Sequence, residues 1–182
     1  MAAKVYKIGL TGGIGCGKSE VRKLLAQRGF STLDADSLSK QIAANDARAV
    51  AAITQAFGDD VYSASGELQR QILAAKVFGS PKALATLNAI VHPLVFEAVE
   101  VEIAKIGRTG KNVVIIEAAL FYESGWNQQM DSMIVVTAPM AKRLAWLRAR
   151  DGASEAQIRA RMAHQIPVEQ KAARAEIGRA HV

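Results

Sequence analysis

The sequence predicts an α/β protein with a parallel sheet, on two observations. Short apolar runs, typical of strands covered on both faces, alternate along the chain with stretches of helical periodicity. A glycine-rich segment at residues 12–19 joins the first apolar run to the first helical stretch. In a parallel α/β sheet, the turns that follow the strands lie at the edge where ligands bind.

The strands are predicted from four apolar runs, at residues 4–10, 30–33, 112–116 and 133–137. Between the first two runs, Val21, Leu24 and Leu25 share one face of a helix, and Gly29 stands where that helix ends. After the fourth run, helices are predicted from about residue 139 to 150 and from 154 to 165. Pro167 interrupts the pattern, and a last helix follows it.

A long, mostly helical stretch separates the second predicted strand from the third, from about residue 37 to 106. Glycine and proline divide it at 58–60, 65–66, 79–81 and His92-Pro93, and at each of these we expect a helix to break. The stretch is too long for a single crossover between parallel strands. We therefore expect a helical lobe grafted onto the sheet.

The composition favours one folded domain with a substantial core. The 182 residues are 50% hydrophobic and 22% charged, which argues against disordered and collagen-like classes. Cys16 is the single cysteine, so no internal disulfide forms, and no cysteine–histidine cluster suggests zinc. No apolar run approaches the roughly 20 residues of a membrane span, and the first residues lack a signal-peptide core. We expect a soluble cytoplasmic protein with no membrane partner.

The net charge of +6 is concentrated near the carboxyl end of the chain. From Lys142 onward there are nine Lys/Arg residues against four Asp/Glu residues. A basic surface attracts nucleic acid, anionic lipid or a phosphorylated small molecule. Only 5% of the residues are aromatic, which is few for stacking unpaired bases. Phosphorylated small molecules are therefore the favoured partners.

The most specific motif is segment 12–19, which matches the phosphate-binding pattern G-x-x-x-x-G-K-[ST] in full. Its glycines let the backbone wrap around a phosphate, and the following helix N-terminus favours an anion. Lys18 is expected to reach the β- and γ-phosphates of a nucleotide, and the Ser19 hydroxyl to ligate Mg²⁺. The predicted nucleotide-binding residues are Gly12, Gly13, Ile14, Gly15, Cys16, Gly17, Lys18 and Ser19.

Cys16 lies inside this loop, and its side chain has two interpretations. A thiol beside a helix N-terminus can be redox-sensitive, because the helix dipole favours the thiolate. The alternative is that the cysteine is only a small side chain in the place of a serine, and this is the interpretation we favour.

Two aspartates, Asp34 and Asp36, follow the second predicted strand. Carboxylates at this edge of a sheet suit phosphoryl transfer. One can accept the proton of an attacking hydroxyl, while the other holds Mg²⁺ or its water molecules. The structural alternative is an N-cap and a first-turn acid of the next helix.

Several further segments, taken in order, resemble the dephospho-coenzyme A kinase family. The residues 9–15 enter the loop, and Asp34-Ala35-Asp36 follows the second strand. The later matches are Arg70 before Val77-Phe78, Ile90 to Leu94, Leu120-Phe121, Glu123 to Gly125, Arg150 to Gly152, Arg161 and Gln165. The loop alone is generic, but the ordered set, which runs from about residue 7 to 175, is specific.

The resemblance implies ATP-dependent phosphorylation of the ribose 3′-hydroxyl of dephospho-coenzyme A, giving coenzyme A and ADP. It also implies a P-loop NTPase fold of three layers, like that of nucleoside-monophosphate kinases. Residues 1–175 would form one kinase domain, with its core at 4–36 and 112–175, an acceptor-binding helical lobe at about 37–111 and a basic lid at about 143–165.

The resemblance further assigns roles to individual residues. Asp36 would be the catalytic base, with Asp34 beside it. Arg70 and His92 would lie in the lobe that holds the acceptor. Arg161 would belong to the lid that closes over the phosphates, where arginines stabilise the charge of the transferring group.

Each of these assignments has a structural alternative. His92 precedes Pro93 and could simply shape a turn. Arg70 could be a solvated helix residue. The arginines of the predicted lid could form an ordinary solvated face; they are Arg143, Arg148, Arg150, Arg159 and Arg161.

The chain departs from the family pattern near the site, at Glu117 and the following Ala118-Ala119, where the family has Pro-Leu, and at Trp146. Glu117 stands at the end of the third strand where the family usually has aspartate, and it is still expected to reach Mg²⁺ through a water molecule. Trp146 stands where an arginine is expected. Either Arg143 or Arg148 compensates for that arginine, or the adenine side of the site is altered.

The last seven residues, 176–182, form the largest departure. The family continues into a fifth strand and a final helix, whereas this segment has no apolar period. It also equals the translation of a common sequencing-adapter read. We therefore expect an artefactual tail on a truncated gene, a missing edge strand and marginal stability, with a natural short tail as the alternative.

Two other functions are open to a chain with this loop. A nucleoside-monophosphate or shikimate kinase would share the loop but lack the ordered set of further matches. A nucleotide- or nucleic-acid-binding module would use the basic carboxyl-terminal region, and its binding would weaken steeply with salt.

Overall fold

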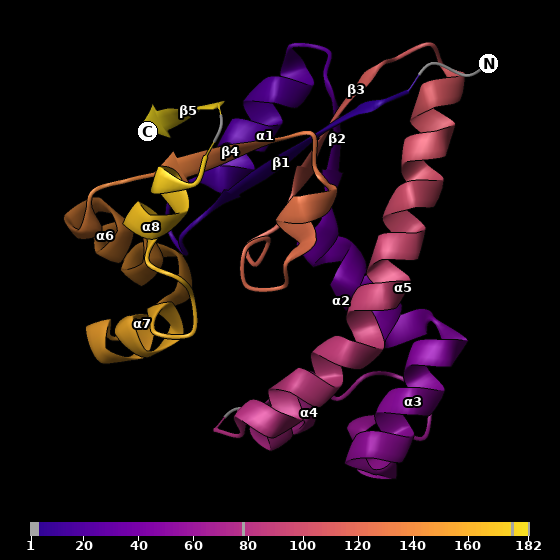
Figure 1. The fold of residues 1–182 in the computed structure, drawn as a ribbon. Coiled ribbons are helices and arrows are strands. Elements are labelled where there is room, and N and C mark those ends of the chain that lie inside the picture. The colour runs from indigo at the N-terminus through magenta and orange to yellow at the C-terminus, as the bar shows by residue number, and fades with distance from the viewer. Residues whose placement is uncertain (1–3, 78, 176, 182) are drawn as a thin grey trace. The chain divides into compact units, whose positions relative to one another are not determined.

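The computed structural model describes residues 4–77, 79–175 and 177–181 (Figure 1). The chain forms two compact units. The first contains residues 1–34 and 103–182, and the second contains residues 35–102. The first unit carries the sheet and the second is helical.

The sheet of the first unit has five strands in the order β2-β3-β1-β4-β5. All four neighbouring pairs are parallel, which confirms the predicted α/β class. The strands are β1 (Tyr6–Gly12), β2 (Ser31–Asp34), β3 (Val113–Glu117), β4 (Ser132–Thr137) and β5 (Ile177–His181).

The core of this unit gathers on the central strands. Leu10, Ile115, Val135 and Val136 are at most 2% exposed and pack together with Val168 of a carboxyl-terminal helix. The strands β3 and β4 are buried along most of their length, as a sheet covered on both faces requires. This explains why both read as continuous apolar runs.

The first strand extends further than its apolar run, through Thr11 to Gly12. These two residues pair with Val135 and Val136 of β4. A Cβ atom at position 12 would lie 2.3 Å from the carbonyl oxygen of Val136, so only glycine allows this close pairing. The strand therefore leads directly into the glycine-rich loop.

The helices of the first unit follow the predicted order. They are α1 (Lys18–Gln27), α6 (Met140–Asp151), α7 (Glu155–Met162) and α8 (Val168–Ala173), with a short 3₁₀ turn η2 (Trp126–Gln129). Helix α7 begins with a reciprocal cap, in which Ser154 and Gln157 each bond the other's backbone N–H. Gly29, with φ of +90°, follows α1 as predicted.

The second unit consists of α2 (Ala35–Asn45), α3 (Ala47–Phe57), the turn η1 (Asp59–Val61), α4 (Arg70–Val77) and most of α5 (Pro81–Arg108). Asp46 caps α3 by accepting the backbone N–H groups of Arg48 and Ala49. The Tyr62 hydroxyl donates to the carbonyl of Ala43 at 2.6 Å and so ties the turn after η1 to α2.

The predicted break at His92-Pro93 is wrong, because α5 runs through Pro93 without interruption. A proline inside a helix costs about 3 kcal/mol or more. Val91, Val95 and Val99 form a buried stripe at four-residue spacing along this helix. Each buried valine contributes roughly 1.5–3 kcal/mol, so the stripe outweighs the proline.

Helix α5 also differs from the expectation that no segment is long and apolar enough to span a membrane. By length and composition alone it meets that requirement, with a mean hydropathy of 1.4 over its most apolar window. A single such helix is weak support for a membrane span, since core helices of soluble proteins meet the same requirement.

The expectation of a missing edge strand is wrong as well. Residues 177–181 lie parallel to β4 as β5, with Ile177 opposite Ile134 and His181 opposite Thr137. A register shift between Ile134 and Val135 accommodates the pairing. An edge strand is held by backbone hydrogen bonds, which every residue except proline can make. An apolar period is therefore not required there.

Candidate active site

The glycine-rich loop lies between β1 and α1, at the N-terminus of the helix, as predicted. Gly15 and Gly17 have φ of +76° and +82°, in the left-handed region that favours glycine. A Cβ atom at position 15 would also lie 2.8 Å from the Leu147 side chain. Lys18 is the first residue of α1. The backbone at this helix N-terminus is suited to hold an anion such as a phosphate group.

Ser19 of this loop is linked to the end of β3. Its hydroxyl donates to Oε1 of Glu117 at 2.8 Å, and the Glu117 side chain is only 4% exposed. The hydroxyl has one proton and two lone pairs, so donation to Glu117 leaves the lone pairs for a cation. The structure thus brings together the two residues predicted to hold Mg²⁺.

Arg22 joins this pair from the next turn of α1, and it was not among the residues predicted for the site. Its Nε donates to Oε2 of Glu117 at 2.6 Å, and its Nη2 to Oδ2 of Asp34 at 3.3 Å. Asp34 and Glu117 are register partners at the ends of β2 and β3. The spacing of three residues between Ser19 and Arg22, one helical turn, was the available signal.

The donor set fits a magnesium ion. Mg²⁺ prefers oxygen ligands and is usually held by one or two protein groups together with substrate phosphates and water. A hydroxyl and a carboxylate stand 2.8 Å apart beside the phosphate loop. Within the described residues there is no cluster of three or more His, Cys, Asp or Glu, as a cage made by protein alone would require.

Asp34 ends β2 and Asp36 lies in the first turn of α2. Asp34 is half-buried and belongs to the Arg22–Glu117 cluster. The place of Asp36 is compatible with the catalytic interpretation and with that of a first-turn acid. Asp36 lies two residues after Asp34, which belongs to this cluster.

The loop residue Ile14 is held by two side chains, one from α6 and one from the turn between α7 and α8. Arg143 of α6 donates from Nε to the Ile14 carbonyl, and Gln165 accepts the Ile14 N–H, each at 3.0 Å. A Cβ atom at position 13 would lie 2.7 Å from Nη2 of Arg143. Arg143 is 5% exposed, so it is part of the support of the loop and not of a solvated face.

Trp146 and Arg148 are exposed residues of the same helix. Trp146 is 40% exposed, and the ammonium group of Lys142 lies 5.9 Å from its ring centroid. Arg148 is exposed and pairs with Glu155. Of the two arginines that could compensate for Trp146, only Arg143 is seen to touch the loop.

The Cys16 side chain is fully buried. It packs in the core cluster with Leu10 and Val136, and its backbone N–H donates to the Gly13 carbonyl at 3.1 Å. Burial against apolar neighbours favours the small-side-chain interpretation over that of an accessible redox thiol.

Arg161, the predicted lid residue, forms an ion pair with Asp151 at the end of α6. Its Nη1 donates to Asp151 at 2.8 Å. Hydrogen bonds from Arg150 and Arg161 lower the pKa of Asp151 from 3.8 to about 2. Among the described residues, Nη2 of Arg161 is buried without a hydrogen-bond partner, so this guanidinium keeps a donor for another acceptor.

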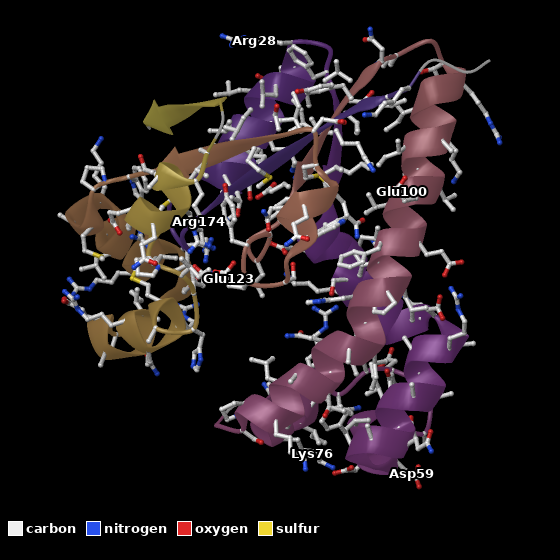
Figure 2. The ribbon with its side chains drawn as sticks, viewed as in Figure 1. Arg28, Asp59, Lys76, Glu100, Glu123 and Arg174 are labelled. Atoms are coloured by element: carbon white, nitrogen blue, oxygen red, sulfur yellow. The ribbon has the colours of Figure 1, made fainter. Side chains whose placement is uncertain are left out.

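An ion pair joins α8 to the loop that follows β3. Lys171 of α8 is fully buried and contacts Glu123 at 2.7 Å and the Ala119 carbonyl at 2.9 Å. Glu123 also accepts the Ile166 N–H at 2.9 Å. The guanidinium of Arg174, at the end of α8, lies 5.8 Å from the ring centroid of Tyr122. Figure 2 labels Arg174 and Glu123 on the ribbon. The sequence matched Glu123 to the family but assigned it no role.

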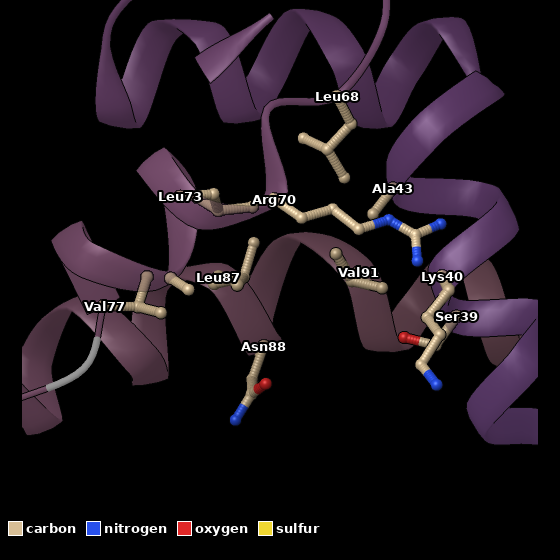
Figure 3. A pocket seen from close by; sticks show the side chains of 11 residues that line it. Ser39, Lys40, Ala43, Leu68, Arg70, Leu73, Val77, Leu87, Asn88 and Val91 are labelled. Carbon is tan, nitrogen blue, oxygen red and sulfur yellow. The ribbon is translucent and has the colours of Figure 1, made fainter. Parts of the chain in front are cut away.

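The second unit contains its own pocket, with a cavity of about 250 Å³. Figure 3 shows the Arg70 side chain crossing the pocket, with its guanidinium on the side of Lys40 and Ser39. The other lining residues are Ala43, Leu68, Leu73, Ala74, Val77, Leu87, Asn88 and Val91. The wall is mostly apolar, with two basic side chains.

The other predicted acceptor residue, His92, is not part of that lining. It lies on α5, with its ring centroid 5.9 Å from that of Phe96. Burial lowers its pKa from the usual 6.5. The structure therefore places Arg70 in a pocket of the helical unit and leaves His92 beside an aromatic ring.

The comparison with protein families decides between the kinases that share this loop. The family model described as dephospho-CoA kinase matches residues 6–178. This chain belongs to the dephospho-CoA kinase family. The resemblance stated from the sequence is confirmed, and the family reaction is the ATP-dependent phosphorylation of dephospho-CoA, the final step of coenzyme A biosynthesis.

Individual relatives are similar in sequence to this chain over most of their length. A dephospho-CoA kinase of Salinibacter ruber is 40% identical over 169 residues, which are 93% of this chain and 85% of that protein. One of Streptomyces avermitilis is 42% identical over 174 residues, 95% of this chain and 83% of that protein.

Solved structures show the same fold. A crystal structure of a Thermus thermophilus protein has a TM-score of 0.86 at 32% identity and covers 98% of this chain and 89% of its own. The dephospho-CoA kinase of Campylobacter jejuni has a TM-score of 0.68 at 25% identity, covering 97% and 87%. The chain is therefore a P-loop kinase, for which ATP is the nucleotide substrate.

Proposed function

We propose that this chain transfers the γ-phosphoryl group of ATP to the ribose 3′-hydroxyl of dephospho-CoA, giving coenzyme A and ADP. The observation that carries the proposal is the family match over residues 6–178. It is supported by a complete phosphate loop between a buried strand and a helix.

ATP is bound through the loop residues 12–19. Their backbone N–H groups and the N-terminus of α1 hold the phosphates, and Lys18 neutralises charge that develops on the β- and γ-phosphates. Ser19 and Glu117 hold Mg²⁺, and their contact of 2.8 Å supports this assignment. When bound, the ion neutralises charge on the phosphate oxygens.

Asp36 is the proposed catalytic base, which accepts the proton of the ribose hydroxyl as the oxygen attacks the γ-phosphorus. Asp34, two residues earlier, is proposed to assist it. The ion pair between Asp34 and Arg22 supports a place for this segment at the phosphate-binding edge of the sheet.

The acceptor is proposed to bind the helical lobe, at about residues 37–111, through Arg70 and His92. The pocket lined by Arg70 and Lys40 supports this, because dephospho-CoA carries phosphates beside less polar groups. Residues 143–165 are proposed as the lid, with Arg161 toward the phosphates, and residues 1–175 as one kinase domain. Arg161 is held by its ion pair with Asp151, and its Nη2 has no hydrogen-bond partner among the described residues.

The proposed partners are small molecules, with neither nucleic acid nor membrane among them, and the proposed location is the cytoplasm. A salt titration tests the first point. Binding to DNA or RNA that is strong at low salt and falls steeply with added salt would contradict it.

The central experiment measures ATP turnover with and without dephospho-CoA, in the presence of Mg²⁺. We expect equal amounts of ADP and coenzyme A, detected by separate assays, and no product without Mg²⁺. Shikimate and nucleoside monophosphates serve as comparison acceptors. Faster turnover with one of them than with dephospho-CoA would overturn the proposal.

A further inference from the structure

Arg22 lies between two carboxylates that end neighbouring strands. Glu117 and Asp34 are register partners at the ends of β3 and β2. Arg22 contacts Glu117 through Nε at 2.6 Å and Asp34 through Nη2 at 3.3 Å. One side chain thus joins the proposed metal-binding carboxylate to the proposed catalytic segment.

The Glu117 side chain is nearly fully buried, and those of Arg22 and Asp34 are partly buried. The side chains of Arg22, Asp34 and Glu117 are 23%, 27% and 4% exposed. Two neighbouring carboxylates repel each other, most strongly where one of them is buried, and both are stabilised by a shared cation. Without that cation, the buried Glu117 would keep only the neutral hydroxyl of Ser19 among these partners.

The Glu117 side chain is long enough to place its carboxylate in several positions, so its orientation affects the proposed metal site. A glutamate has one more rotatable bond than aspartate, and its carboxylate can take more positions. Here Oε2 is held by Arg22 and Oε1 by Ser19, so both oxygens are assigned. Oε1 is thereby held next to the Ser19 hydroxyl, on the side of the phosphate loop.

We infer that Arg22 is a positioning residue, which orients the Glu117 carboxylate toward the divalent cation of the nucleotide and holds Asp34 in line with it. The inference rests on the proposed function for the identity of the cation site. Arginine suits the task because its planar fork reaches two carboxylates at once, whereas lysine offers a single point charge.

The test compares Arg22→Lys and Arg22→Met with the native chain. The matched control is Lys23→Met, whose target is 60% exposed and pairs on the surface with Glu20. Mn²⁺ binding in the presence of ATP is followed by electron paramagnetic resonance, and metal-free ATP binding by calorimetry. Urea unfolding shows whether each variant is folded.

For both Arg22 variants we expect weaker Mn²⁺ binding, by about 10- to 100-fold, with metal-free ATP affinity unchanged. Arg22→Lys keeps the charge, so it should stay closer to native stability than Arg22→Met while still losing metal affinity. Native Mn²⁺ affinity in Arg22→Lys would overturn the positioning role, because charge alone would then suffice.

A double variant tests whether Arg22 acts through the orientation of Glu117. With Glu117→Asp the shorter carboxylate has fewer positions, so we expect Arg22→Lys to cost clearly less Mn²⁺ affinity in that background. Equal losses in both backgrounds would contradict the inference. Because Mn²⁺ and ATP binding need no acceptor, these outcomes stand apart from whether dephospho-CoA is the substrate.

Discussion

Arg143 donates a hydrogen bond from Nε to the carbonyl oxygen of Ile14, at 3.0 Å across 129 positions of sequence. Gln165 accepts the N–H of the same residue. Both polar backbone groups of one phosphate-loop residue are thus held by side chains from the region of α6 and α7. The shape of the loop therefore depends on helices that are distant in sequence.

Replacing Arg143 with alanine should loosen the loop. The change removes a buried, charged donor and leaves the Ile14 carbonyl without it, so we expect a loss of about 1.5–3 kcal/mol in the free energy of unfolding. ATP affinity should fall as well. Urea unfolding and calorimetric ATP titration measure the two effects. Arg148→Ala, which removes an exposed arginine of the same helix that pairs with Glu155, is the matched control and should lose less of both.

Lys18→Ala should abolish transfer while leaving the fold intact. The lysine starts α1, and its proposed partner is the phosphate chain of ATP. Circular dichroism and the melting temperature check the fold, and ADP release checks turnover. Near-normal turnover together with native ATP affinity would show that the phosphate-loop assignment is wrong.

Asp36→Asn should lose about 10²- to 10⁴-fold in kcat, because an amide keeps the shape of the side chain but cannot accept the ribose proton. ATP binding should remain. The comparison variant is Asp34→Asn, which weakens the ion pair with Arg22 and should lower stability. If the larger kcat loss appears in Asp34→Asn instead, the base is Asp34.

Lys171 and Glu123 should stabilise the fold only when both are present. Removing one partner leaves the other charge without its counterpart, so Lys171→Met is expected to cost about 3–5 kcal/mol of stability. Adding Glu123→Gln should recover part of that loss. Chemical denaturation measures both, with the exposed Lys82→Met as a surface control. A double variant less stable than Lys171→Met alone would contradict the expectation.

His92 should make stability depend on pH. Burial lowers the pKa of His92 from 6.5, so the unfolded chain binds the proton first as the pH falls. The full stability of the neutral form is therefore present above 6.5 and is lost as the pH falls from 6.5 toward the folded-state pKa. In His92→Gln, the urea midpoint should vary less over this window. His164→Gln, at an exposed position, controls for the loss of one imidazole.

The local patterns of the sequence determined the fold class and the phosphate loop. Strands β3 and β4 are buried on both faces and therefore read as apolar runs, and a loop that wraps a phosphate requires glycines at set positions. The break expected at Pro93 failed because burial of the valines along α5 outweighs a local rule. Strand β5 was missed because its pairing uses backbone groups, which carry no sequence pattern.

Only the tertiary structure decided which side chains support the loop. Arg22 could have been a solvated helix residue, and it was found beside Glu117 and Asp34 because α1 packs where β2 and β3 end. Arg143 and Gln165 reach Ile14 from more than a hundred positions away. Such contacts depend on how distant segments pack together. The sequence contains both partners of each contact, but nothing in it shows that they lie close together in space.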